Sequence, residues 1–365
     1  MIALVFISFF VSVLAVLGVL VVASRHAHHY DPDAPQRFHA GHVPRVGGAG
    51  MLLGLAAGWL SAACFGRDVF NVTLAPSLAL AALACLLPAV LGGIADDVTQ
   101  RLSPRWRLLL TILSALLGCL LLNLTLTRVG IPWLDDRLVR WPFVAGLFAV
   151  VAMGGLPHAF NLIDGYNGLA ATVTLFICVA LAHVSLQVGD RQLAAMILCL
   201  AGATAGFLFW NYPRGLIFAG DGGAYLWGVV IAIVSITLVQ RHAQVSPWFP
   251  MLLLMYPVSE TLFSIYRKLA RGQSPGSPDA LHFHQLVFRR VVRGTAVGDD
   301  TRTMLMRNNR TSPYLWALAL FTVFPALLFW RNTPLLIAAC CAFAMAYVAL
   351  YVAIVRFKVP HWLRK

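Results

Sequence analysis

Residues 2–24 read IALVFISFFVSVLAVLGVLVVAS, an apolar stretch without one charged side chain. A helix needs roughly 20 apolar residues to cross the hydrocarbon core of a bilayer. Backbone groups inside lipid must hydrogen-bond to one another, so such a stretch is predicted to be a helix. The stretch is too long for a signal peptide and lacks an early basic region and a small-residue cleavage site. We therefore interpret it as a retained membrane span.

The same kind of stretch recurs along the chain. Further apolar runs lie near residues 47–64, 73–93, 106–126, 142–160, 168–187, 192–210, 222–240, 248–266, 313–330 and 334–355. The chain is 60% hydrophobic and 11% charged, whereas a soluble domain carries about 25% charged residues. The sequence predicts an all-α polytopic membrane protein with about 10–11 transmembrane helices. Residues 1–365 would form one multi-spanning domain, in which 267–312 is the longest cytoplasmic loop.

Basic residues are unequally divided between the two ends of these spans. One side carries only seven of the 27 Lys and Arg residues, namely Arg67, Arg128, Arg137, Arg140, Arg191, Arg241 and Arg331. The basic side of a membrane protein is normally cytoplasmic. We therefore expect the N-terminus outside and the C-terminus inside. The net charge of +13 then reflects topology and anionic lipid headgroups rather than nucleic acid, for which no basic stripe with aromatics is present.

Acidic residues gather where spans meet the cytoplasm. Asp96 with Asp97, Asp164 and Asp221 form three such places, while Glu260, the only glutamate, lies within a span. A carboxylate near hydrocarbon is costly unless it is paired, hydrated or bound to a cation. Oxygen ligands suit Mg²⁺, so we expect these acids to share one metal ion.

Basic side chains on the same face could meet phosphate: Arg37, Arg45, Arg101, Arg105, Arg214, His282 and His284. Carboxylates, a divalent cation and surrounding bases are typical of phosphate chemistry.

Each acidic stretch also has a simpler explanation. The two acids of residues 92–97 (GGIADD) could cap a turn, and residues 161–169 (NLIDGYNGL) are rich in turn-forming Asn and Gly. Glycines in residues 211–224 (NYPRGLIFAGDGGA) allow close backbone approach, yet turn chemistry does not explain Asp221 at the head of a span. Two histidines in residues 279–285 (DALHFHQ) are by themselves a weak zinc pattern.

Five stretches in order resemble the cytoplasmic loops of one family. Residues 37–48 (RFHAGHVPRVGG) have its His and Pro-x-x-Gly-Gly, and residues 96–105 have Asp-Asp followed by Leu-Ser-Pro-Arg. Residues 161–165 (NLIDG), 217–221 (IFAGD) and 282–286 (HFHQL) are similar to the third, fourth and fifth loops. The chain thus resembles the polyprenyl-phosphate N-acetylhexosamine-1-phosphate transferases, glycosyltransferase family 4, and within it the undecaprenyl-phosphate GlcNAc-1-phosphate transferase-like branch. The resemblance covers most of the chain, from about residue 31 to 290.

The resemblance implies a reaction at the bacterial inner membrane, with the active site cytoplasmic. Undecaprenyl phosphate attacks the diphosphate of a UDP-N-acetylhexosamine, UMP leaves, and a lipid-diphosphate sugar remains. UDP-GlcNAc would be the donor, and a 6-deoxy-HexNAc nucleotide is a second option. The product would initiate O-antigen, teichoic acid or another surface glycan. The oligomeric state stays open, with a homodimer as one option.

Residue roles are also implied by the resemblance. Asp221, with Asn161, would bind Mg²⁺, for which Mn²⁺ could substitute. Asp96 and Asp97 would position or deprotonate the lipid phosphate, and with Asp164 and Asp221 they make up the catalytic set. The remaining assignments are nucleotide-sugar binding by Asn161, Asp164, Asn167, Asn211 and Arg214, and phosphate or sugar binding by Arg45, His282 and His284.

Two departures from the family pattern stand out. Asn167 replaces an Asp found in many bacterial relatives, although the eukaryotic dolichyl-phosphate branch also has Asn there. Gln285 replaces a His, so the three adjacent His residues of the muramoyl-pentapeptide transferase branch are absent. That makes a phospho-N-acetylmuramoyl-pentapeptide donor an alternative rather than the leading prediction.

Other function classes fit the same residues less well. A transporter would place charges within broken spans and show repeat symmetry; only Glu260, near Pro257, fits that description. A CDP-alcohol phosphotransferase would carry its acids in one helical motif that is absent from the sequence. A catalytically inactive homologue would not need so many polar groups at the span ends.

Overall fold

A computed structural model describes residues 1–23, 43–274, 276, 281–292 and 301–356. Within these residues the chain is helical and contains no strand. In order, the elements are α1 (Ile2–Ala23), α2 (Gly47–Phe65), the π-helix η2 (Gly66–Phe70), α3 (Pro76–Thr99), α4 (Pro104–Leu121), α5 (Pro132–Arg140), α6 (Pro142–Ile163), α7 (Leu169–Gln187), α8 (Arg191–Asn211), α9 (Gly220–Arg241), α10 (Trp248–Leu253), α11 (Met255–Ala270), α12 (Phe283–Leu286), the π-helix η3 (Val287–Val292), α13 (Thr301–Phe329) and α14 (Thr333–Val355).

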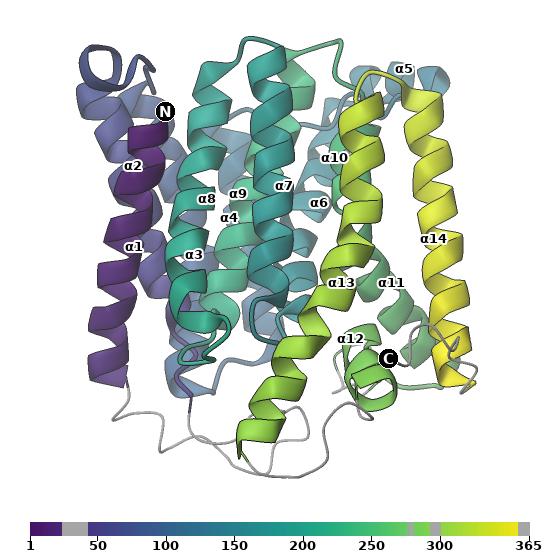
Figure 1. Cartoon of the computed structure of the whole chain (residues 1–365). Helices are drawn as coiled ribbons and strands as arrows, with labels where there is room; N and C mark the ends of the chain where they lie inside the picture. The colour runs from purple at the N-terminus through teal and green to yellow at the C-terminus, as the bar shows by residue number, and fades with distance from the viewer. Residues whose placement is uncertain (24–42, 275, 277–280, 293–300, 357–365) are drawn as a thin grey trace.

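Ten of the described helices are long and apolar enough to cross a membrane. The chain is therefore an all-α integral membrane protein, which confirms the predicted fold class. The predicted span 248–266 differs from the others, because two shorter helices, α10 and α11, cover it end to end (Figure 1). The chain breaks at Leu254 between Pro250 and Pro257, and proline lacks the N–H that a continuous helix needs.

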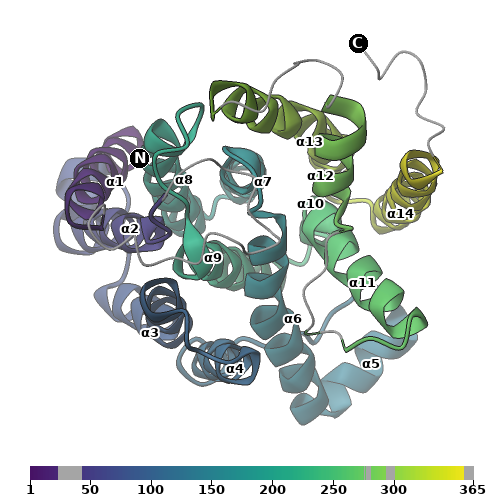
Figure 2. The same ribbon diagram turned by 90° about the horizontal axis from the view of Figure 1, so that it is seen from below.

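The helix α9 lies at the centre of the bundle. It packs against α2, α3, α4, α6, α7 and α8 (Figure 2). Nearly all of its side chains are buried, whereas α1 leaves one face of large apolar side chains exposed, as expected next to lipid. The N-terminus of α9, which carries Asp221, is thus surrounded by other helices at the lower end of the bundle in Figure 1.

The helices α10 to α14 form a group along one side of this central bundle (Figure 2). Here α14 packs against α10, α11 and α13, and α13 also contacts α7. The helix α13 begins at Thr301, well before the predicted span at 313. Its first turns carry Arg, Asn, Thr and Ser, so hydropathy reveals only the part of the helix that follows them. The loop predicted at 267–312 therefore contains α12, η3 and the start of α13.

Candidate active site

Glycines bring the ends of α2, α3 and α9 into backbone contact. A Cβ added to Gly93 on α3 would lie 2.5 Å from the backbone nitrogen of Gly222, and one on Gly48 would lie 2.2 Å from that of Gly223. No side chain fits at such distances, so these positions require glycine. The stretch before α2 also pairs with the one before α9, because Phe218 N donates to Pro44 O at 2.9 Å. This pairing carries Arg45 to the start of α9.

The buried Asp97 caps the central helix. Its two carboxylate oxygens accept the backbone N–H groups of Asp221, at 2.8 Å, and Gly222, at 2.9 Å. A carboxylate at a helix N-terminus satisfies backbone donors that have no partner within the helix. Asp97, at the end of α3, therefore fixes the position of Asp221 across the helix interface.

Arg107 joins two of the predicted acids. Its Nη1 atom lies 3.2 Å from Asp96 Oδ2 and 2.8 Å from Asp221 Oδ2. The other oxygen of Asp96 accepts the backbone N–H of Leu102 at 2.9 Å, within the loop between α3 and α4. All three charged side chains are partly buried, which strengthens their attraction relative to a surface ion pair. Arg107 was part of the quoted loop sequence, but no role was predicted for it.

Asp221 has two further neighbours from the surrounding helices. Asn161 Nδ2, near the end of α6, donates to Asp221 Oδ1 at 2.7 Å, and the Tyr225 hydroxyl donates to Asp221 Oδ2 at 3.1 Å. The Tyr225 ring packs edge-on against His158 at 5.2 Å between centroids. Tyr225 and His158 were not predicted, since both lie inside apolar runs where an aromatic residue usually indicates packing.

The donor set suits a hard cation. Asp96 and Asp221 each place a carboxylate oxygen on the same nitrogen of Arg107. The side-chain amide of Asn161 contacts Asp221, and rotating it would turn its oxygen toward an ion. Magnesium takes few protein ligands and keeps water and substrate phosphate as the others. Among the described residues, no group of three or more His, Cys, Asp or Glu forms a metal cage. Asp221 and Asn161 therefore fit an ion that is held in part by substrate.

The loop after α6 brings Asp164 to the same end of the bundle. Burial raises the pKa of Asp164 from 3.8 to about 7, although the positive charge of Arg45 lowers it. Its surface is only partly accessible. Asp164 lies close enough to Arg45 and Asp221 to interact electrostatically with both. The loop thus adds a carboxyl group close to Arg45 and Asp221.

The amides of Asn167 and Asn211 hold loops together. Asn211 Oδ1 accepts the backbone N–H of Gly168 at 2.6 Å, and its Nδ2 donates to Ile217 O at 2.8 Å. Asn167 Nδ2 donates to Asn309 Oδ1 at 2.9 Å, and its backbone N–H donates to Asn308 Oδ1 at 2.9 Å, both on α13. Both side chains are buried. Their predicted contact with the nucleotide sugar stays a prediction.

His284 packs on the same loop. Its ring lies 5.5 Å from the Tyr166 ring, and a Cβ added to Gly165 would lie 2.8 Å from its Nε2 atom. His282 stacks on His284, with 5.5 Å between ring centroids. The structure thereby brings both histidines to the Asp164 loop. Arg214 lies apart from this group, exposed and stacked over Phe209 at 5.4 Å.

Part of the first predicted loop lies outside the described residues. That part is residues 37–42 with Arg37 and His39, whereas Pro44 to Gly48 are described. The polar residues Asn308, Asn309 and Ser312 of α13 were not predicted. The Ser312 hydroxyl donates to the backbone oxygen of Asn167 at 2.6 Å. These three residues follow a long loop, and nothing in the sequence indicates which part of the chain they would contact.

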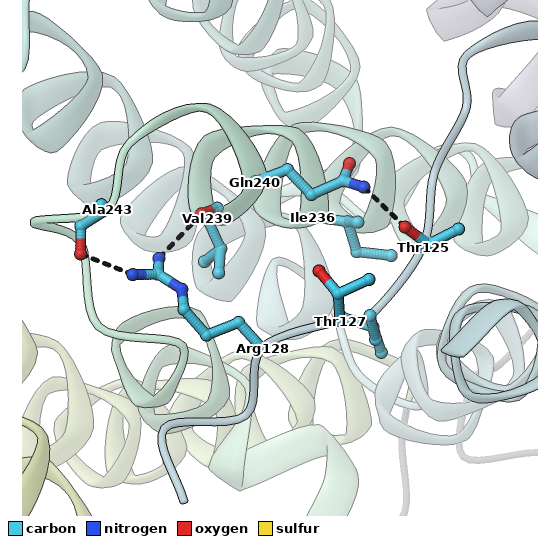
Figure 3. A pocket seen from close by; sticks show the side chains of 8 residues that line it. Thr125, Thr127, Arg128, Ile236, Val239, Gln240 and Ala243 are labelled. Atoms are coloured by element: carbon cyan, nitrogen blue, oxygen red, sulfur yellow. Dashed lines mark hydrogen bonds between the residues drawn. The ribbon is translucent and has the colours of Figure 1, made fainter. Parts of the chain in front are cut away.

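A pocket of about 180 Å³ lies near the opposite end of α9, away from these residues (Figure 3). Arg128 lines it and donates to the backbone oxygens of Val239, at 2.7 Å, and Ala243. It also donates to Val245 O at 2.7 Å. Carbonyls at a helix C-terminus lack partners within the helix, so Arg128 stabilises the end of α9. This pocket is part of the scaffold rather than of the acidic site.

The part of the chain that carries the acidic residues is similar to a known protein family. Residues 79–239 match the model of glycosyl transferase family 4. The matched range contains Asp96, Asp97, Asn161, Asp164 and Asp221, but it ends before the two histidines.

Named relatives agree with the family match. A probable undecaprenyl-phosphate N-acetylglucosaminyl 1-phosphate transferase of Bacillus subtilis is 28% identical over 76% of this chain and 75% of its own length. An undecaprenyl-phosphate alpha-N-acetylglucosaminyl 1-phosphate transferase of Thermotoga maritima is 28% identical over 78% and 80%. A decaprenyl-phosphate N-acetylglucosaminephosphotransferase of Mycolicibacterium smegmatis is 28% identical over 67% and 65%. The chain is therefore similar to the glycosyl-1-phosphate transferases of glycosyl transferase family 4.

Proposed function

We propose that this protein transfers N-acetylhexosamine-1-phosphate from a UDP-sugar to undecaprenyl phosphate and releases UMP, with a requirement for Mg²⁺. UDP-GlcNAc is the donor that we favour, because the relatives named above act in GlcNAc-1-phosphate transfer. The product would initiate a cell-surface glycan such as O-antigen or teichoic acid. The reaction would take place at the cytoplasmic face of the bacterial inner membrane.

The observation that carries the proposal is the group formed by Arg107, Asp96 and Asp221. One guanidinium nitrogen contacts both carboxylates, at 3.2 and 2.8 Å, beside the N-terminus of the central helix. An arginine favours phosphate oxygens. The two carboxylates favour a cation that would accompany a diphosphate. A site for two phosphate-bearing substrates requires both kinds of group.

The chemistry exchanges one phosphoanhydride bond for another. An oxygen of the lipid phosphate forms a bond to the phosphorus that carries the sugar, and the bond from that phosphorus to the bridging oxygen breaks. The bridging oxygen leaves with UMP. A phosphate monoester with a second pKa of about 6 is mostly dianionic at neutral pH, so the attacking oxygen needs no strong base. Asp96 would therefore act chiefly by positioning.

The residues of the chain would bind and align the two substrates. Asp221 and Asn161 would hold the metal ion, which when bound neutralises charge on the diphosphate and on the leaving UMP. Arg107 would exchange a carboxylate for a phosphate oxygen as substrate enters. Arg45 and the histidine pair would contact phosphate or sugar, and the Asp164 loop would hold the nucleotide.

The test is UMP release by the purified full-length protein in detergent. The assay contains Mg²⁺, undecaprenyl phosphate and a panel of UDP-N-acetylhexosamines that includes UDP-N-acetylmuramoyl-pentapeptide. We expect lipid-dependent UMP release from UDP-GlcNAc, lost on chelation and in Asp221→Asn. An exposed variant at the far end of the bundle, Asn71→Asp, serves as the control and should keep wild-type activity. Failure of every donor with intact lipid and folded protein would contradict the proposal.

A further inference from the structure

The only glutamate of the chain is completely buried and surrounded by donors. Glu260 on α11 has no exposed surface. Its Oε1 atom accepts the backbone N–H of Phe283 at 3.0 Å and lies 3.2 Å from His282 Nδ1. Its Oε2 atom accepts the Tyr347 hydroxyl of α14 at 2.7 Å. Burying a carboxylate is costly unless hydrogen bonds surround it, and here the start of α12 and the helix α14 provide them.

Glu260 decides which nitrogen of His282 carries a proton. His282 also starts α12, where its side chain can accept the backbone N–H of Gln285 in a capping box. Nδ1 cannot both donate to Glu260 and accept from Gln285, because a ring nitrogen is either protonated or not. A carboxylate beside an unprotonated nitrogen would be repulsive, so the contact with Glu260 places the proton on Nδ1. The other ring nitrogen, Nε2, is then available to a ligand.

A second clamp holds the residue just before this histidine. Arg267 lies on the same face of α11 as Glu260, further along the helix. It donates to Leu281 O, and the Tyr351 hydroxyl of α14 donates to the same oxygen at 3.1 Å. Arg267 also donates to the Tyr351 hydroxyl. Two tyrosines of α14, one turn apart, thus hold the segment that leads into α12. Short helices of this size are not stable by themselves, so α12 depends on these contacts.

The supported segment reaches the candidate active site. His282 and His284 are stacked with their ring planes 14° apart, and His284 meets Tyr166 and Gly165 of the Asp164 loop. A chain of contacts therefore runs from Tyr347 through Glu260 and His282 to the loop that would hold the nucleotide sugar. Glu260, Arg267, Tyr347 and Tyr351 all lie beyond residue 239, where the match to the family model ends.

We propose that Glu260, together with the Tyr347 hydroxyl, is a positioning residue that orients the His282 ring for contact with the diphosphate sugar. The carboxylate fixes Nδ1, and the stack with His284 sets the ring against the Asp164 loop. The helices α11 and α14 then act as a support for the last cytoplasmic motif. This inference rests on the proposed function, which names the substrate that the histidines would meet.

A merely structural role for Glu260 would leave a different pattern. Removing the carboxylate alone leaves the Phe283 N–H and the Tyr347 hydroxyl without an acceptor, which lowers stability. If Glu260 only satisfied these donors, Glu260→Met would be less stable, but the protein that folds would keep wild-type kinetics. If Glu260 orients His282, the folded Glu260→Met protein would also lose activity. Glu260→Gln keeps an oxygen acceptor and should lose less stability and less activity than Glu260→Met.

The experiment compares Glu260→Met, Glu260→Gln and Tyr347→Phe with wild type in the full-length protein. Tyr256→Phe is the matched control, because its hydroxyl lies on the same helix, is buried and has no hydrogen-bond partner in the described part of the chain. For Glu260→Met we expect kcat/KM for the UDP-sugar to fall roughly 10- to 100-fold, the range for carboxylates that orient a functional histidine. Glu260→Gln and Tyr347→Phe should lose less, and Tyr256→Phe nothing. Unchanged kcat/KM in Glu260→Met would overturn the proposal.

A second readout does not depend on turnover. Protein labelled with ¹⁵N-histidine reports which ring nitrogen is protonated, and His282→Gln assigns the resonance. We expect the Nδ1-protonated form in wild type. In Glu260→Met the proton should move to Nε2, because Gln285 N–H then captures Nδ1. An unchanged tautomer would overturn the proposal, even if no donor of the panel released UMP. Absence of UMP with the expected tautomer change would instead count against the proposed function alone.

Discussion

Arg107 shows how much one side chain adds to the acids that the sequence predicted. The acids were recognisable because carboxylates are rare in this chain, whereas arginines are common at its span ends and none stands out. Only the structure shows that Nη1 of Arg107 lies between Asp96 and Asp221. Without it, two carboxylates would face one another with like charge, which is unfavourable at close range.

The first prediction concerns this arginine. We expect Arg107→Gln to lower kcat/KM for UMP release by roughly 100- to 1000-fold, the cost of removing one preorganised donor from a charged transition state. Arg140→Gln, an exposed arginine on α5, should behave as wild type. The measurement is steady-state UMP release at several Mg²⁺ concentrations. Wild-type kcat/KM in Arg107→Gln at every Mg²⁺ concentration would show that the guanidinium contributes only to the resting structure.

The neighbours of Asn167 explain why this position has Asn where many relatives have Asp. Asn309 Nδ2 donates to Pro213 O at 2.6 Å, which fixes the orientation of that amide. Asn309 Oδ1 therefore faces Asn167 and needs a donor, which Asn167 Nδ2 supplies. An Asp at position 167 would place two acceptors against each other. The sequence revealed the departure, but the partner on α13 could not be predicted because it lies 142 residues away.

We accordingly predict that Asn167→Asp, although it restores the residue of many relatives, destabilises this protein. The lost buried hydrogen bond should cost about 1–3 kcal/mol in the free energy of unfolding. The expected result is a lower midpoint in a thermal unfolding experiment and reduced UMP release. Asn71→Asp, at an exposed position, is the matched control. A midpoint equal to that of wild type would mean that the amide of Asn309 can turn over freely.

Hydropathy predicted most of the helices because the solvent around them is lipid. Each apolar run had to become a helix, and ten described helices have the required length and composition. Hydropathy did not predict the division into α10 and α11, because hydropathy averaged over many residues does not change at the backbone break at Leu254. It also placed the start of α13 late, since its first turns are polar. Both differences fall in the helices that support the histidine segment.

The junction of α3 with α9 gives a prediction about an element. A Cβ at Gly93 would overlap the backbone nitrogen of Gly222 at 2.5 Å, and neither helix end can move without displacing Asp97 and Asp221. We expect Gly93→Ala to cost about 1–3 kcal/mol of stability, as for other overpacked interfaces, and to reduce activity in the folded fraction. Gly155→Ala on α6 is the control, because nothing lies within 4 Å of the added Cβ. Similar activity and unfolding midpoints in the two variants would contradict the close packing.

The candidate site is assembled by the position of α9 in the whole bundle. Because α9 is enclosed by other helices, its N-terminus collects side chains from α3, α4 and α6 at one end. Motif order in the sequence was sufficient to predict that these loops share a side of the membrane. It was insufficient to predict the contribution of α14, because Tyr347 lies in a run that looks like any lipid-facing span. The interior of a membrane protein and its lipid-facing surface are equally apolar, so composition cannot separate them.

The orientation of the bundle is the last prediction. Met1 lies at one end and the C-terminal end of α14 at the other (Figure 1), as expected for an odd number of crossings when α10 and α11 count as one. The positive-inside bias predicts that the acidic site faces the cytoplasm. In a cysteine-free background that retains activity, we expect Gln244→Cys to react with a membrane-impermeant maleimide in intact cells and Gln273→Cys to react only after lysis. Both positions are exposed, Gln244 in a turn and Gln273 directly after one, so reactivity depends on the side of the membrane. The reverse labelling pattern would place the phosphate site outside, where a cytoplasmic UDP-sugar could not reach it, and would remove the basis for the proposed reaction.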